Sequence, residues 1–145
     1  MQTQRMGATL YELLITLSML GVLMTAAAPR IKSTIDVLAL RAAREGIFGL
    51  FTRARSLALQ HGGASIELSG QSDRVTVRLP SGVVEHEVLL APQSVDLLPD
   101  ASADPVVLRY DAYGLGRMMS RTITLVSGNA RGGLTVSSFG RVRRW

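Results

Sequence analysis

One carboxylate, Glu12, lies in an otherwise uncharged stretch that runs from Ala8 to Pro29. An ionised carboxylate in apolar surroundings needs a partner charge, because removing an unpaired charge from water is costly. A carboxylate at such a position is therefore predicted to pair with a cation. Glu12 is therefore the first candidate functional residue.

Arginines form the second candidate site. No acidic residue follows Asp111, whereas six arginines do, namely Arg117, Arg121, Arg131, Arg141, Arg143 and Arg144. Arginine presents a planar, permanently charged fork that matches phosphate or carboxylate groups. In an extended strand Arg141 and Arg143 would point to one side and Val142 to the other. The pattern indicates either a site for an anionic partner or a solvated edge strand whose charges prevent pairing with other strands.

Other chemistries lack the residues that they need. The chain has no cysteine, which excludes disulfides, thiolate metal sites and a cysteine nucleophile. The spacing of His61 and His86 matches no metal motif, and the glycines around Leu115 read as a turn. Three aspartates in a proline-containing loop lack the spacing of a calcium loop, namely Asp96, Asp100 and Asp104. We therefore predict no enzyme activity, no metal and no cofactor.

The element that carries Glu12 is a long apolar helix. From Ala8 to Pro29 it would extend roughly 33 Å at about 1.5 Å per residue, enough to cross a hydrocarbon core of about 30 Å. Three interpretations compete. A cleavable signal peptide is suggested by the alanines at 26–28, and a plain signal anchor by the length. The third interpretation gives Glu12 a role, and it rests on a sequence resemblance.

The segment Gly7-Ala8-Thr9-Leu10-Tyr11-Glu12-Leu13-Leu14 resembles the prepilin motif of type IV pilins and type II secretion pseudopilins. The resemblance implies that prepilin peptidase cleaves after Gly7 and that Ala8 is then N-methylated. It further implies that Glu12 pairs with the N-terminal amine of a neighbouring subunit and so sets the axial register. Pro29 would be the site of a helix bend.

After Pro29 the apolar positions recur at three or four residues, which predicts an amphipathic continuation of the helix as far as the glycines at 62 and 63. The predicted stripe comprises Ile31, Ile35, Leu38, Ala42, Ile47, Leu50, Ala54 and Leu57, widened by Phe48 and Phe51. The pattern then changes to a period of two, which predicts short antiparallel strands near 65–68, 74–79, 83–88, 106–110, 122–126 and 134–137. We expect an α+β fold in which one long N-terminal helix, half membrane-spanning and half amphipathic, packs on antiparallel sheets.

This layout resembles the H-type minor pseudopilins of the GspH/FimT-like family. The resemblance rests on Ala54-Arg55-Ser56, on an aromatic-x-x-x-Gly turn at 110–114, and on a final strand with Gly-Arg at 136–143. It implies four segments: a leader (1–7), a transmembrane assembly helix (8–29), its amphipathic continuation (30–62) and a globular β domain (63–145).

The same resemblance implies a minor pseudopilin of a type II secretion system. The expected partners are other pseudopilins or pilins, the prepilin peptidase and the bacterial inner membrane, with the β domain in the periplasm. The run Gly140-Arg141-Val142-Arg143 is also similar to an element of FimT-type members that bind DNA. The alternative function is therefore a DNA-binding minor pilin that uses Arg141, Arg143 and Arg144.

Overall fold

The computed structural model describes residues 9–100, 103–117 and 119–145. One helix, α1, runs without interruption from Leu10 to His61. At its start the backbone N–H of Glu12 donates to the Thr9 hydroxyl at 3.3 Å, so Thr9 is the N-terminal cap. At its end Gly62 adopts a φ of +77°, a left-handed conformation that glycine accepts without strain. The predicted helix end is confirmed, whereas a bend at Pro29, which lies inside the helix, stays a prediction.

The chain forms two units, of which the first ends at Thr34 and the second comprises Ile35–Trp145. All buried apolar side chains of the described residues belong to the second unit, between Leu40 and Val136. Because this unit carries a whole hydrophobic core, we expect it to fold without the first unit.

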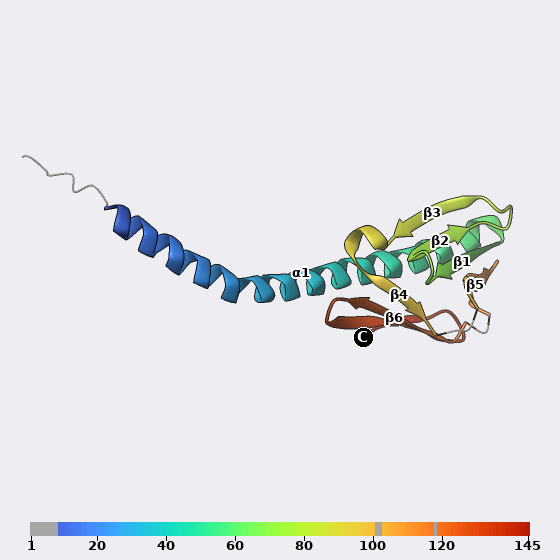
Figure 1. Cartoon of the computed structure of the whole chain (residues 1–145). Helices are drawn as coiled ribbons and strands as arrows, with labels where there is room; N and C mark the ends of the chain where they lie inside the picture. Colours follow the sequence, from blue (N-terminus) through green and yellow to red (C-terminus); the bar gives the residue numbers. More distant parts are fainter. Residues whose placement is uncertain (1–8, 101–102, 118) are drawn as a thin grey trace, which may run out of the picture. The chain divides into compact units, whose positions relative to one another are not determined.

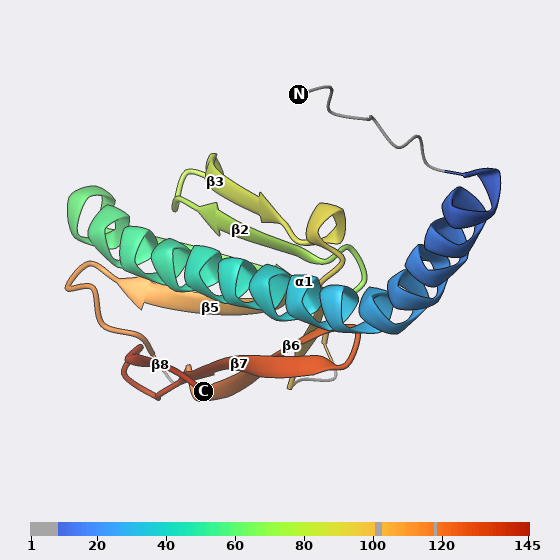
Figure 2. The same cartoon turned by 90° about the vertical axis from the view of Figure 1, so that its left-hand side faces the viewer.

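The second unit contains two four-stranded antiparallel sheets (Figures 1 and 2). In the first sheet the order is β3-β2-β1-β5, and the strands are β1 (Gly63–Ser69), β2 (Arg74–Arg78), β3 (Val84–Leu89) and β5 (Val106–Asp111). In the second sheet the order is β4-β6-β7-β8, and the strands are β4 (Asp96–Pro99), β6 (Arg121–Ser127), β7 (Ala130–Val136) and β8 (Val142–Arg144). A short 3₁₀ helix, η1 (Ala91–Gln93), precedes β4. The α+β architecture predicted from the sequence is confirmed.

The core lies between the second part of α1 and the inner faces of both sheets. The helix contributes a stripe with helical spacing, namely Leu40, Ala43, Ile47, Leu50, Phe51, Ala54 and Ala58. The sheets contribute fully buried residues such as Ile66 and Leu68 from β1 and Leu125 and Leu134 from β6 and β7. Figure 2 shows this part of α1 running along the strands that it covers.

Two expectations from the sequence were wrong. Asp96 and Pro99 lie in strand β4 and not in a loop; the strand is at a sheet edge, where proline costs no ladder hydrogen bond. The apolar stripe was placed correctly at Ile47, Leu50 and Ala54. Farther toward the N-terminus, however, Ile31, Ile35, Leu38 and Ala42 are exposed. The buried face of the helix begins at Leu40, and it is turned away from these four residues.

Candidate functional site

The N-terminal part of α1 carries a continuous exposed apolar surface. Its large side chains are between 37% and 81% exposed, namely Leu10, Tyr11, Leu13, Leu14, Ile15, Leu17, Met19, Leu20, Val22, Leu23, Met24, Ile31, Ile35, Val37 and Leu38. The helix includes a segment that is long and apolar enough to cross a membrane. The apolar surface nevertheless continues past Arg30 and Lys32, where Ile31, Ile35 and Leu38 lie on one helix face. These residues extend the apolar surface beyond the segment that a bilayer would cover.

Glu12 occupies the first turn of this helix and is exposed. With Thr9 it forms the Thr-x-x-Glu pattern of a capping box, in which glutamate at this position supports the helix start. The carboxylate thus has a local role that needs no partner molecule, beside the intermolecular role expected from the sequence. Gly7 and Ala8, between which cleavage is expected, lie outside the described residues.

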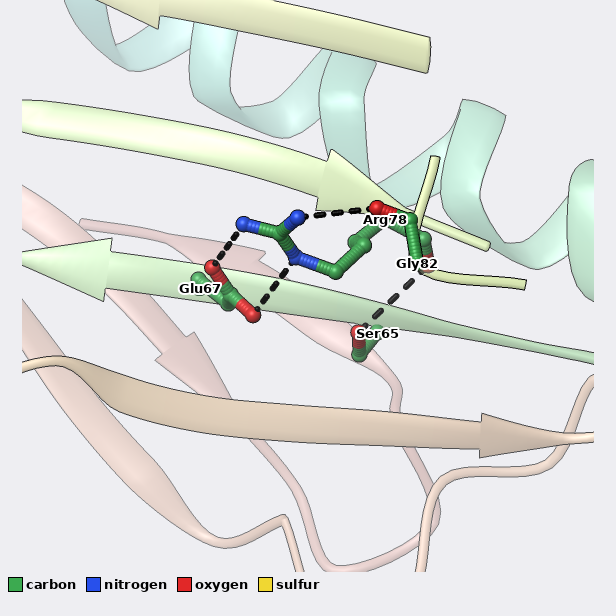
Figure 3. Close-up of polar contacts among 4 residues, drawn as sticks. All are labelled: Ser65, Glu67, Arg78 and Gly82. Carbon is green, nitrogen blue, oxygen red and sulfur yellow. Dashed lines mark hydrogen bonds and ion pairs between the residues drawn. The ribbon is translucent and has the colours of Figure 1, made fainter. Parts of the chain in front are cut away.

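The outer face of the first sheet carries charges that neutralise one another. Arg78 donates from Nε and Nη2 to the two carboxylate oxygens of Glu67, each at 3.0 Å, and from Nη1 to the carbonyl of Gly82 at 2.9 Å (Figure 3). Glu67 raises the pKa of the Arg78 guanidinium through these bonds and through its charge. On the same face Arg74 pairs with Glu87 at 2.9 Å. These arginines are engaged within the domain, so we do not assign this face an anionic ligand.

Strand β8 places Arg143 and Arg144 on opposite sides of its sheet. Arg144 pairs in register with the buried Leu134, and its side chain turns toward α1. There its Nη1 donates to Glu45 Oε2 at 2.7 Å, and its guanidinium carbon lies 4.7 Å from the centroid of the Phe48 ring. Arg143 pairs with the exposed Thr135 and lies on the opposite side of the sheet.

Arg141 and Arg143 are exposed, and neither guanidinium has a hydrogen bond or an ion pair to another part of the chain that the structure describes. The backbone of Arg141 is fixed, because its N–H donates to the Ser137 hydroxyl at 3.0 Å and its carbonyl accepts from the Ser137 N–H at 2.8 Å. The sequence had grouped Arg144 with these two residues. The structure places Arg144 apart, in an ion pair.

A groove of about 500 Å³ opens between α1 and the turns of the β domain. Its walls are mostly apolar or aromatic, and its lining comprises Phe48, Phe51, Thr52, Arg55, Tyr110, Leu115, Phe139, Gly140, Arg141 and Val142. The groove brings together the three segments on which the resemblance to H-type pseudopilins rests, although they lie far apart in the sequence.

Tyr110 ties these segments together at the bottom of the groove. Its hydroxyl donates to the carbonyl of Gly140 at 3.2 Å, which links β5 of the first sheet to the turn between β7 and β8 of the second. Burial raises the pKa of Tyr110 to about 12, and the positive charge of Arg55 opposes this shift. Gly140 has a φ of +83°, and a Cβ on it would lie 2.7 Å from Tyr110 Cε1, so only glycine fits here.

The turn after β5 is held by Asp111. Its carboxylate accepts the N–H groups of Leu115 and Tyr113, each at 3.0 Å, and lies 3.7 Å from Arg117. The Leu115 hydrogen bond, followed by the Tyr113 bond and the Arg117 charge, holds the pKa of Asp111 below its usual value. Gly114 completes the turn with a φ of +68°. The glycines around Leu115 thus form a turn, as the sequence predicted.

The remaining candidates lie apart. His86 contacts Arg53 at 3.5 Å, and Asp104 accepts the N–H groups of Gly70 and Gln71 at 3.2 and 2.8 Å. Within the described ranges no three histidine, aspartate or glutamate side chains form a group that could hold a metal ion. Sequence reasoning did not assign a function to Arg55, and it did not place Phe139 beside it. These two residues lie in one groove because of the tertiary fold, and no local sequence pattern predicts this arrangement.

Comparison with solved structures identifies the fold. Two crystal forms of the type IV minor pilin FimU from Pseudomonas aeruginosa are similar to this chain, with TM-scores of 0.60 and 0.57. Each similarity covers 73% of this chain at 18% identity, and 87% and 92% of the FimU chains respectively. The chain has a pilin-like fold. No protein-family description and no curated protein sequence matches it.

Proposed function

We propose that the chain is a membrane-anchored subunit of a pilin-like filament. The observation that carries this proposal is the apolar surface of α1, which continues past the charged residues Arg30 and Lys32 to Leu38. A bilayer needs only about 20 apolar residues of helix. The additional apolar face at Ile31, Ile35 and Leu38 is exposed to water in an isolated subunit. Packing against equivalent helices in a filament would bury it.

The structure and the comparison support different parts of this proposal. The pilin-like fold supports assembly with related subunits, since FimU is itself a minor pilin. The prepilin-like segment supports cleavage after Gly7 and methylation of Ala8. In the assembled state Glu12 pairs with the N-terminal amine of a neighbour, and the β domain lies in the periplasm. The capping role of Glu12 is compatible with this, because capping uses the backbone while the carboxylate remains exposed.

Mass spectrometry of the protein from its native cells tests the processing step. A mature N-terminus at a methylated Ala8 is expected, and it should be lost when prepilin peptidase is absent. A mature N-terminus at Pro29 would instead identify the apolar helix as a removed signal peptide and would refute the proposal.

Substitution of Glu12 tests the assembly step. Glu12→Gln retains the capping pattern, because glutamine serves at this position as well as glutamate. It removes the charge, and breaking a buried pair costs about 3–5 kcal/mol. We expect membrane insertion to remain normal while incorporation into filaments falls at least about tenfold, whereas Glu12→Asp, which keeps the charge, should retain part of it. Normal incorporation of Glu12→Gln would show that Glu12 is only a helix cap.

We further propose that the filament belongs to a type II secretion system and that the chain is one of its low-copy minor pseudopilins. This proposal rests on the H-type segments that meet at the groove. Deletion of the gene should then leave exported proteins in the periplasm while surface pili remain. Loss of pili with normal secretion would assign the chain to a type IV pilus instead.

A second candidate is DNA binding, favoured by the exposed, unpaired guanidinium groups of Arg141 and Arg143. Contacts to phosphates would be independent of sequence and sensitive to salt. In a gel-shift assay with residues 35–145, Arg141→Ala combined with Arg143→Ala should lower the affinity and reduce the salt slope by about one unit per contact. Arg144→Ala is the matched control, since Arg144 is paired with Glu45. Unchanged affinity and slope in the double variant would rule out these two arginines as the DNA site.

A further inference from the structure

The groove between α1 and the β7–β8 turn has features that the stability of the domain does not explain. Phe139, at its lip, is 75% exposed although it is a large aromatic side chain. An exposed phenylalanine of this kind contributes little to the core, and it is typical of a contact surface. Leu115, on the opposite turn, is 45% exposed and adds to the same apolar lip.

Arg55 and Arg141 add charge to this apolar site from two separate elements, the helix and the turn. Four other arginines of the domain have a carboxylate partner within 4 Å, namely Arg74, Arg78, Arg117 and Arg144. Among the described residues Arg55 and Arg141 have none, and no acidic side chain lines the groove. The groove therefore presents two positive charges without a counter-charge.

The aliphatic stem of the exposed Arg55 side chain lies beside the turn after β5. A Cβ on Gly114 would lie 3.1 Å from its Cγ, so the side chain packs against the turn after β5. Its charge also acts on the buried Tyr110, as the pKa of that residue reflects.

The shape of the site favours a protein ligand over a nucleic acid. A nucleic-acid groove follows the phosphate chain with a row of cations, whereas here the next arginine, Arg143, lies on the side of β8 opposite Val142, which lines the groove. Two arginines around an aromatic floor match a single carboxylate, or two, beside an apolar side chain.

We propose that this groove receives an acidic segment of another filament subunit, in which an aspartate or glutamate stands beside an aromatic or aliphatic side chain. The carboxylate binds between Arg55 and Arg141, and the apolar side chain packs on Phe48, Phe51 and Phe139. This inference rests on the proposed function, because it takes the partner from the same filament.

Photo-crosslinking of the full chain in its native cells tests this assignment. Phe139→p-benzoylphenylalanine places the reactive group at the lip of the groove, and the same residue at Val83, exposed in the turn before β3, is the control position. We expect a crosslink from position 139 to one filament subunit, in a peptide that contains an acidic residue close to the crosslinked site. Position 83 should not give that product.

Charge reversal shows whether the two arginines hold the partner. Arg55→Glu and Arg141→Glu should each lower the yield of this crosslink by at least about tenfold, since breaking a desolvated charge pair has effects of this size or larger. Arg143→Glu is the matched control and should leave the yield unchanged. Replacement of the partner's acidic residue by arginine should restore the crosslink of Arg141→Glu. Thermal unfolding of each variant as residues 35–145 confirms that the domain is folded.

Several results would overturn the assignment: no crosslink above the Val83 level, a crosslink to nucleic acid or to a segment without a carboxylate, or a yield that both reversals leave unchanged. A chain that enters filaments but gives one of these results overturns the groove assignment alone. A chain that never enters filaments overturns the proposed function as well.

Discussion

Replacement of Tyr110 by phenylalanine should make the domain less stable at neutral pH and more stable at high pH. At neutral pH the variant loses the hydrogen bond to the carbonyl of Gly140 and leaves that buried acceptor without its partner. A loss of this kind costs about 1–2 kcal/mol of unfolding free energy. The hydroxyl links the two sheets, so its removal also loosens the turn before β8.

The sign reverses in alkali because burial raises the pKa of Tyr110 from 10.0 to about 12. Below pH 10 the phenol is neutral in both states, and the folded state keeps the full benefit of its environment. Between pH 10 and 12 the unfolded chain releases the proton while the folded chain retains it, so stability falls. Two pKa units correspond to about 3 kcal/mol, which exceeds the cost of the lost hydrogen bond.

Urea unfolding of residues 35–145 at a series of pH values measures both effects. The wild-type domain should be more stable than Tyr110→Phe at pH 7, and the order should invert as the pH approaches 12. Tyr113→Phe removes an exposed phenol and is the matched control. Curves for the wild type and Tyr110→Phe that stay parallel at all pH values would refute the claim that the phenol is buried and neutral at the seam between the sheets.

Three further predictions concern the same part of the domain. Gly140→Ala should lower the unfolding free energy by at least about 2 kcal/mol, since alanine is strained at a φ of +83° and contacts Tyr110; a smaller loss in urea unfolding would mean that the turn can relax. Arg144→Ala should cost about 1 kcal/mol, as expected for an exposed ion pair with Glu45 and a cation–π contact, and should speed amide hydrogen exchange in β8. Asp111→Ala should remove stability only above the ordinary carboxyl pKa. The lowered pKa means that its contribution is present there and is lost as the pH falls, so wild type and variant should converge in acid unfolding experiments.

Local sequence signals predicted most of the fold. The strands near 65–68, 106–110 and 122–126 were predicted because one face of each is buried, which leaves an alternating pattern. Strand β4 was missed because it is short, ends in proline and gains its structure from pairing with β6. The helix gives a second example. The sequence pattern indicated an apolar face, but which helical turns the β domain covers depends on contacts with residues distant in the sequence.

The roles of the arginines could not be predicted from their spacing alone. The side on which Arg141 lies stays a prediction, because Arg141 precedes β8. Within β8, alternation correctly placed Arg143 on the side opposite Val142, because strand geometry is local. It gave no means to know that Arg144 faces Glu45 on a helix that precedes it by 99 residues. Nor did it indicate that Arg141 shares a groove with Arg55, since that depends on how the Gly140 turn is held by Tyr110.

This difference in partners separates three arginines that the sequence groups together. Arg144 is paired within the domain, so its loss should change stability more than binding. Arg143 projects from the outer side of its strand, where only an external anion could engage it. Arg141 lies at the groove beside an exposed phenylalanine, so its loss should affect a ligand with both charge and apolar surface. Single substitutions at the three positions therefore distinguish folding, polyanion binding and subunit contact, and equal effects of all three on any one assay would contradict this division.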